Sequence, residues 1–166
     1  MTGALHRVGQ FWRHASARVR VEEAANADRI LGPSLAPLFH SLPVNDQRHG
    51  LDVLATVTRV DDHPERLLLQ AALLHDVGKG GARFSIIDRS VTVFLHALSP
   101  RLLDAALGAR PGLARRYRIY ADHARIGAER VRAAGAGELA AIIAEHHATE
   151  PSLDITRRLQ RADRRN

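Results

Sequence analysis

Apolar residues recur along most of this chain at intervals of three and four positions, and no segment alternates strictly between apolar and polar residues over the length of a strand. Such spacing places apolar side chains on one face of an α-helix. Alanine and leucine, which both favour helices, dominate the same segments. The pattern therefore predicts an all-α fold, a single-domain helical bundle.

Glycine, proline and capping residues divide the pattern into separate expected helices. Residues 91–94 favour strands by type, but the length of segment 88–98 and its lack of turn signals favour a helix there. Asn45 or Asp46 is expected to cap the helix that ends at residue 60. The expected helices are 5–19, 22–31, 34–42, 46–60, 65–77, 88–98, 100–107, 113–134, 138–148, and one from 151 to the chain end.

The stretch Leu-Leu-His-Asp-Val-Gly-Lys-Gly at residues 73–80 places two polar residues at the end of an apolar helical run. His75 and Asp76 follow that run, and Gly78 is expected to end the helix because glycine adopts the left-handed conformation without strain. Burying an imidazole beside a carboxylate costs free energy unless something pairs with both groups. A divalent metal ion is such a partner, since both groups are ordinary metal ligands in proteins.

Four other expected helices also carry a histidine or an aspartate on the apolar face. One buried residue of this kind is ordinarily a hydrogen-bonded core group, but five helices with the same feature indicate one shared polar centre within a bundle. The residues on these faces are His49, His75, His123, His146 and Asp163. The histidines near turns, on polar faces or outside this series, for which no role in the centre is expected, are His6, His14, His40, His63 and His96.

The formal net charge is +6, and the chain contains four Phe, two Tyr and one Trp. Apart from clusters at 115–116 and 157–165, the positive residues are scattered over the expected helix faces. So few aromatic residues offer no platform on which bases could stack, and a nucleic acid partner is therefore not favoured. A basic surface does attract a phosphorylated small molecule. Lys79, the only lysine among 24 basic residues, stands three residues after Asp76, beside the expected polar centre.

Length and composition limit the number of domains, the redox chemistry and the location of the chain. The 166 residues suffice for one domain with one core. The chain has no cysteine, which excludes disulfides and thiolate chemistry. No run of 18 apolar residues and no apolar segment of signal-peptide length at residues 1–9 is present. We therefore expect no membrane span and no membrane partner, with the cytoplasm as the default location.

The order of these polar residues resembles that of the HD-domain metal-dependent phosphohydrolase superfamily. The stretch at 73–80 is similar to the HD-x-G-K form of the family's motif, and residues 123–130, His-Ala-Arg-Ile-Gly-Ala-Glu-Arg, are similar to the segment that carries the next ligand. The resemblance extends from Asp46 to the chain end. It implies an HD-type metal-binding helical domain at 45–166, with N-terminal helices at 1–44 that pack on it. The ordered series is His49, His75-Asp76, His123, His146-His147 and Asp163.

The resemblance also implies two divalent metal ions, of manganese, iron or a similar metal. One ion is expected on His49, His75, Asp76 and Asp163, and Asp76 is expected to bridge to a second ion held by His123 and His146. His147 is expected as an extra ligand or a substrate contact. Lys79 is the first candidate for a catalytic and phosphate-binding side chain at the rim. Arg48 and Arg83 are weaker candidates for contacts with the substrate.

The activity that this resemblance implies is hydrolysis of a nucleotide or another small phosphate ester by a metal-activated water. Residues 148–151, Ala-Thr-Glu-Pro, lack the Gly-Tyr-Pro stretch of the branch that cleaves cyclic di-GMP, so that branch is disfavoured. A diiron oxygenase stays open because the same ligands suit iron. A module that binds a nucleotide without turnover is the third reading. The residues before His49 carry no readable chemistry and either pack over the bundle or form a homodimer.

Overall fold

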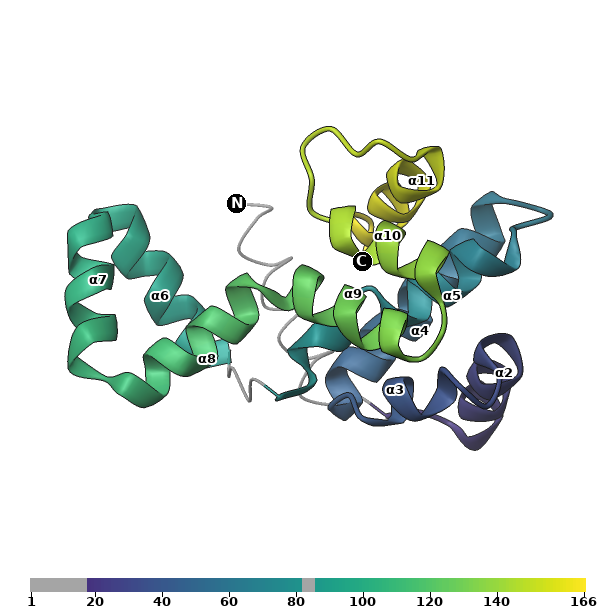
Figure 1. The fold of residues 1–166 in the computed structure, drawn as a ribbon, viewed down its shortest axis with the longest axis horizontal. Helices are drawn as coiled ribbons and strands as arrows, with labels where there is room; N and C mark the ends of the chain where they lie inside the picture. The colour runs from purple at the N-terminus through teal and green to yellow at the C-terminus, as the bar shows by residue number, and fades with distance from the viewer. Residues whose placement is uncertain (1–17, 82–85) are drawn as a thin grey trace, which may run out of the picture.

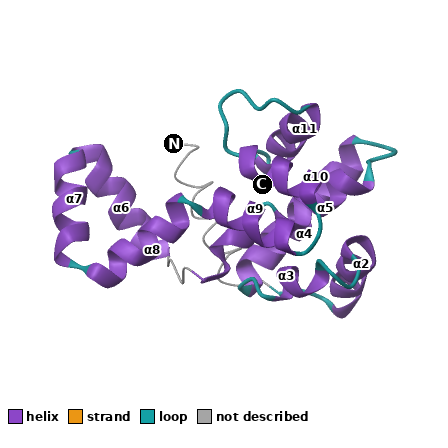
Figure 2. Cartoon of the chain, in the orientation of Figure 1, coloured by secondary structure: helices purple, strands orange, loops and turns teal. Residues whose placement is uncertain are grey.

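The computed structural model of the chain describes residues 18–81 and 86–166. Every regular element in these two ranges is helical, and no strand is drawn among them in Figure 2. The expected all-α, single-domain fold is therefore confirmed. The expected helix at 5–19 lies almost entirely outside the described residues, and so does Arg83.

The described part of the chain contains ten α-helices and one short 3₁₀ helix. Most lie within a few residues of the bounds expected from the hydrophobic pattern, including the helix over the strand-favouring residues 91–94. In chain order the elements are α2 (Val21–Leu31), α3 (Ala36–His40), α4 (Val44–Val60), α5 (Arg66–Leu74), η1 (Val77–Gly81), α6 (Ile86–Leu98), α7 (Pro100–Ala109), α8 (Pro111–Ala121), α9 (His123–Ala133), α10 (Gly137–Glu145) and α11 (Asp154–Asp163).

The central stretch departs from the expected helix. α5 ends at Leu74, two residues of turn follow, and the chain then continues as η1. Gly78 lies inside η1, and among the described glycines only Gly32 and Gly135 have a positive φ. The expectation that Gly78 ends the helix in the left-handed conformation is therefore wrong. The glycine is needed instead because a Cβ at this position would lie 1.9 Å from the carbonyl oxygen of His123.

Two further boundaries differ from expectation. The single helix expected at 113–134 is divided into α8 and α9, with a turn at Asp122 directly before His123. α4 begins at Val44 after Pro43, and neither Asn45 nor Asp46 caps it. Local hydrophobic spacing continues through Asp122, so the pattern did not reveal the break, which lies where α9 begins to pack against η1.

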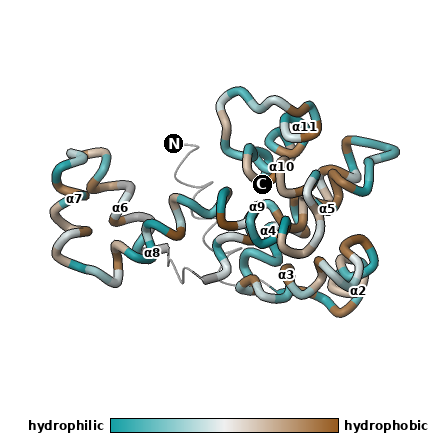
Figure 3. The backbone as a smooth tube through the Cα atoms, viewed as in Figure 1, coloured by the Kyte–Doolittle hydropathy of each residue, from teal (hydrophilic) through white to brown (hydrophobic). Residues whose placement is uncertain are grey.

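α5 lies at the centre of the bundle and contacts α2, α3, α4, α10 and α11. Its sequence is almost wholly apolar, and the tube of Figure 3 is brown along much of it. Leu68, Leu73 and Leu74 are buried, and they belong to one hydrophobic core that also includes residues of α2, such as Leu31. A helix this apolar is stable only when other helices cover it.

Helices α6, α7 and α8 project away from the bundle and form what we call the projecting lobe (Figure 1). α6 contacts α7, α7 contacts α8, and the lobe joins the rest of the molecule mainly where α8 meets η1 and α9. Large apolar side chains on the lobe are exposed, among them Phe94, Leu98 and Leu102. None of the helices in the described ranges is long and apolar enough to cross a membrane.

Candidate metal centre

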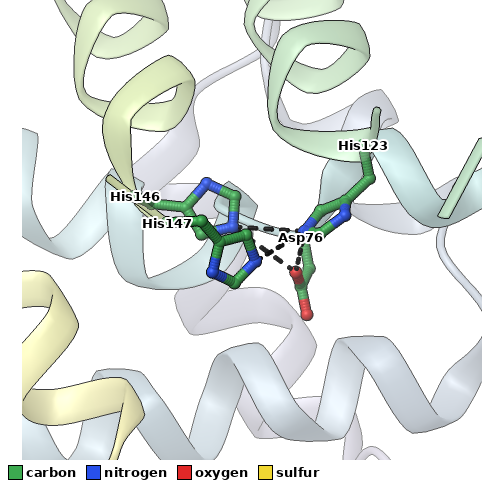
Figure 4. Close-up of side chains that lie close together, drawn as sticks. All are labelled: Asp76, His123, His146 and His147. Atoms are coloured by element: carbon green, nitrogen blue, oxygen red, sulfur yellow. Dashed lines mark hydrogen bonds and ion pairs between the residues drawn. The ribbon is translucent and has the colours of Figure 1, made fainter. Parts of the chain in front are cut away.

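Five parts of the bundle bring their polar residues to one place beside α5. All six residues expected to bind metal are described, and they meet there together with His147. α4 supplies His49, the turn after α5 supplies His75 and Asp76, the first position of α9 supplies His123, the end of α10 supplies His146 and His147, and the last turn of α11 supplies Asp163. The arrangement of four of them is drawn in Figure 4.

The carboxylate of Asp76 belongs to two groups of possible ligand atoms. One of them, with His123, His146 and His147, is drawn in Figure 4. Oδ1 of Asp76 lies 3.3 Å from Nε2 of His123 and 3.8 Å from Nε2 of His146. Its Oδ2 lies 3.6 Å from Nε2 of His75 and 4.0 Å from Nε2 of His49. One oxygen thus faces each group, which is the arrangement that a carboxylate bridging two cations needs.

Asp163 completes the group around Oδ2 of Asp76. Its Oδ1 lies 2.9 Å from Nε2 of His49 and 3.7 Å from Nε2 of His75. Two carboxylates and two imidazoles therefore gather on this side, contributed by α4, the turn after α5 and α11. Oxygen and imidazole nitrogen together are suited to manganese, iron or zinc rather than to a soft ion.

Backbone carbonyls fix the proton positions on three of the imidazoles. Nδ1 of His75 donates to the carbonyl of Ala72 at 3.0 Å, and Nδ1 of His146 donates to the carbonyl of Ile143 at 2.6 Å. A carbonyl has no proton to give, so each Nδ1 carries the hydrogen and each Nε2 presents a lone pair when the ring is neutral. Nδ1 of His123 is held at 2.6 Å in the same way, by the carbonyl of Tyr120. Ligand histidines are ordinarily oriented by such a bond.

The lone pairs of His123 and His146 face one another across the centre. Nε2 of His123 lies 3.3 Å from Nε2 of His146, and in the neutral rings neither atom carries a proton. Nε2 of His75 is buried and has no hydrogen-bond partner among the described residues. An unpartnered buried polar atom is costly, and facing lone pairs repel one another. A cation placed among these nitrogens would give Nε2 of His75 a partner and would separate the lone pairs of His123 and His146. The residues present therefore fit divalent metal ions.

Burial keeps most of these imidazoles neutral. It lowers the pKa of His75 and His147, and it lowers the pKa of His146 to about 3. Burial also opposes the charged form of His49, but the hydrogen bond to Asp163 and the charge of Asp76 outweigh it and raise the pKa of His49. Neutral imidazole is the form that binds metal.

The two carboxylates stay ionised despite their burial. Burial alone disfavours the charge on Asp76, yet the ammonium of Lys79, 2.6 Å from Oδ2, favours that charge and holds the pKa of Asp76 well below its usual range. Burial likewise opposes the charge on Asp163, and its hydrogen bond with His49 lowers the pKa of Asp163. Ionised carboxylates beside neutral imidazoles are the protonation states in which both groups ligate a cation.

The candidate substrate-binding residues lie in different surroundings. Nζ of Lys79 lies 2.6 Å from Oδ2 of Asp76 and 5.8 Å from the ring centroid of Tyr120, so this side chain is part of the centre. Nε2 of His147 lies 3.0 Å from Nε2 of His123. Arg48, by contrast, is bound to carboxylates on α2 and α4, namely those of Glu23 at 2.8 Å and Asp52 at 3.0 Å.

Close backbone approach holds the centre's two halves together. η1 packs against α9 with Gly78 facing Gly127, and a Cβ on Gly78 would lie 2.7 Å from the backbone nitrogen of Gly127. Arg130 of α9 reaches across and donates to the carbonyl of Val77 at 2.7 Å. These contacts place the start of α9, and with it His123, beside Asp76.

Sequence reasoning did not identify the groups that orient the ligands. The carbonyls that accept from His75, His123 and His146 each belong to the residue three positions earlier. His75 and His146 stand at the C-terminal caps of α5 and α10, where the last carbonyls of a helix lack intrahelical partners. A histidine directly after an apolar helical run is therefore a usable signal. Tyr120, whose ring lies beside Lys79 and His123, carried no such signal.

The family model of the HD domain matches residues 47–165, which include every one of the ligand candidates. The chain therefore belongs to the HD domain family, a class whose fold is of the metal-dependent hydrolase type and binds divalent metal ions. Comparison with curated proteins and with solved structures gives no match. The match confirms the family to which the chain belongs.

Proposed function

We propose that this chain is a metal-dependent phosphohydrolase that acts on a nucleotide or another small phosphate ester. The observation that carries the proposal is the set of imidazole nitrogens, with proton positions fixed by backbone carbonyls, around the carboxylate of Asp76. His49, His75, Asp76 and Asp163 would hold one divalent ion. Asp76, His123 and His146 would hold a second, with His147 as an additional ligand or a substrate contact.

Bound divalent ions supply hydroxide near neutral pH and neutralise charge on a phosphoryl group. The chain's own residues then have three tasks. Asp76 presents one oxygen to each ligand group and would hold both ions. Lys79 lies against Oδ2 of Asp76 and is placed to bind a phosphate oxygen at the rim of the centre. Burial of His75 and His123 excludes water from the inner side of the centre.

Arg48 is the weaker candidate for a substrate contact because Glu23 and Asp52 already occupy its guanidinium. Arg83 lies outside the described residues and stays a prediction from the sequence. We assign the small-molecule contact first to Lys79, since its ammonium lies within the ligand cluster itself. A phosphate-bearing substrate also suits the basic character of the chain, whose net charge is +6.

The test is elemental analysis of protein purified without air or chelator, together with a screen of phosphate esters. We expect about two ions per chain, from the two ligand groups that share Asp76. The Asp76→Ala variant should lose metal and activity together, because it removes the shared ligand. The matched control is Asp122→Ala, which removes an exposed carboxylate next to His123 and should leave metal content unchanged. Full metal occupancy in Asp76→Ala would contradict the bridging role.

Lys79→Ala separates substrate binding from metal binding. We expect metal content close to that of the original chain and hydrolysis reduced by about 10²-fold, the loss typical of one electrostatic donor. Iron as the bound metal with oxygen consumption during turnover would replace the hydrolase by a diiron oxygenase. Binding of a nucleotide by the metal-loaded protein without turnover of any ester would replace it by a binding module.

A further inference from the structure

Positive charge is concentrated in the C-terminal segment 154–166, which contains α11 and the three residues after it. Residues 154–166 contain five arginines and two aspartates, which gives +3, half of the formal net charge of the chain. The two aspartates stand at the ends of the helix, Asp154 in its first turn and Asp163 at its last position. The arginines are Arg157, Arg158, Arg161, Arg164 and Arg165.

Three of these arginines border an open cavity of about 350 Å³ between α11 and the loop that precedes it. The cavity contains three guanidinium groups against one carboxylate, so it is net positive. The hydroxyl of Thr149 can donate a further hydrogen bond. The lining residues are Thr149, Glu150, Pro151, Arg157, Gln160, Arg161 and Arg164.

Neighbouring groups already position two of the three guanidinium groups. Arg157 donates to the carbonyl of Pro151 at 2.8 Å and lies 3.4 Å from Asp154. Arg164 donates to the side-chain oxygen of Gln160 at 3.1 Å. Arg161 stands between them, exposed, and its side chain makes no hydrogen bond or ion pair with the described part of the chain. Each guanidinium has five donors, so most of the donors in the cavity are available to a ligand.

We propose that this cavity, the α11 anion site, binds the phosphate or diphosphate group of a small molecule other than the one hydrolysed. Guanidinium groups pair with phosphate oxygens through two parallel hydrogen bonds, which makes arginine the usual residue for such groups. The donors converge on one concavity rather than extending along the chain surface. A small phosphorylated ligand therefore fits the site better than a nucleic acid backbone, whose phosphates need a long basic track.

The α11 anion site is connected to the metal centre through Gln160. Its side-chain amide donates to the carbonyl of His146 at 3.1 Å and to that of Ala148 at 2.8 Å, while the same residue lines the cavity. α11 also ends with Asp163, which lies 2.9 Å from His49. A ligand that holds α11 against this loop therefore also holds two ligand-bearing segments of the centre, so the site is suited to an effector.

The experiment uses the full chain, stripped of metal and dialysed, with pyrophosphate as the probe in a calorimetric titration. We expect Arg161→Gln to weaken pyrophosphate binding by about tenfold or more, since it removes charge-assisted hydrogen bonds. The matched control is Arg101→Gln on α7, which removes an equal charge from an exposed position in the projecting lobe and should not alter binding. Because metal is absent, the result does not depend on whether the chain hydrolyses anything.

Hydrogen exchange gives a second readout that does not rely on a variant. Pyrophosphate should slow amide exchange within 154–163 and 146–151 in the metal-free chain, and it should leave exchange in α7 unchanged. Three results overturn the proposal: no binding of pyrophosphate, equal losses in Arg161→Gln and Arg101→Gln, or protection only by long oligonucleotides. The last result would identify the arginines as a nucleic acid contact.

Discussion

The bundle around α5 and the projecting lobe are built from similar helices but are stabilised in different ways. In the bundle, Leu73 is 1% exposed and Leu74 is fully buried, with His75 of the centre directly after them. In the lobe, Phe94 is 63% exposed and Leu98 is 59% exposed, although both belong to a helix of 13 residues. The helix that leads into the metal centre is thus covered by other helices, whereas α6 leaves large apolar side chains exposed.

The glycines of the two regions show the same difference. A Cβ on Gly78 would lie 1.9 Å from the carbonyl oxygen of His123, and a Cβ on Gly127 of the facing helix would lie 3.1 Å from the backbone nitrogen of Gly78. Gly108, within α7 of the lobe, has nothing within 4 Å of its added Cβ. Backbone contact this close is possible only without side chains, so glycine is required in the bundle and is merely present in the lobe.

The largest effect is expected for Gly78→Ala. Its Cβ would lie 1.9 Å from the carbonyl oxygen of His123, and backbone atoms must move to relieve the contact. We expect a loss of about 3 kcal/mol or more in the free energy of unfolding, at the upper end of overpacking costs. Displacement of His123 should also reduce metal content. Urea unfolding and elemental analysis measure the two effects.

The matched substitution in the lobe is Gly108→Ala, which places the same methyl group in open space within α7. It should stabilise the protein by up to about 1 kcal/mol, because alanine has a higher helix propensity than glycine. Metal content should not change. Comparable losses of stability from Gly78→Ala and Gly108→Ala would show that the two regions do not differ in packing as described.

A smaller effect is expected from pH in the metal-free chain. The pKa of His146 is about 3 in the folded protein, below its ordinary value of 6.5, so between these values the unfolded state binds a proton that the folded state does not. Stability therefore falls as pH decreases through this window, by about 1.4 kcal/mol per pH unit for one such group. His49 acts in the opposite sense, since its pKa is raised and its contribution is lost at higher pH.

Thermal unfolding of metal-free protein between pH 6.5 and 5 measures this dependence, with an expected loss of about 2 kcal/mol from His146 alone. His146→Asn should flatten the profile, because asparagine does not titrate. The control is His96→Asn, which removes an exposed histidine of the lobe and should leave the slope unchanged. An equal slope in the His146→Asn variant would show that burial of this imidazole does not cause the dependence.

The fold and the composition of the site could largely be predicted from the sequence, because both depend on helical spacing. His49, His123 and His146 extend apolar faces, and their helices do converge on His75 and Asp76. Helical periodicity determines which face of a helix a residue lies on, and residues on apolar faces come together when the bundle forms.

The parts that could not be predicted depend on contacts between segments far apart in the chain. Gly78 was interpreted as a helix end, whereas its role is the close approach of η1 to α9. The break at Asp122 was missed for the same reason, since nothing local interrupts the helical pattern there. The arginines of 157–165 were visible as a charge cluster, but the cavity that three of them line with the loop at 149–151 exists only in the folded chain.

The smallest effect is expected for Arg116→Gln, which removes the ion pair between α8 and α6 in the lobe. Nη2 of Arg116 lies 3.2 Å from Oδ1 of Asp88, and the two side chains are 38% and 19% exposed. Pairs this accessible contribute about 0–1 kcal/mol, so urea unfolding should change little. Amide exchange in α6 should nevertheless become faster while metal content stays constant, because the pair joins helices that the bundle does not cover.

Arg130→Gln removes a single polar contact in the bundle, as Arg116→Gln does in the projecting lobe. It tests whether the two regions also differ in the contribution of such contacts. Arg130 donates to the carbonyl of Val77 at 2.7 Å, and Val77 is fully buried. A buried carbonyl left without its donor costs about 1–3 kcal/mol, more than an exposed ion pair contributes. We expect faster exchange in η1 and α9 and weaker metal retention. If Arg116→Gln destabilised the protein as much as Arg130→Gln, the lobe would have to be treated as part of the structure that holds the metal centre.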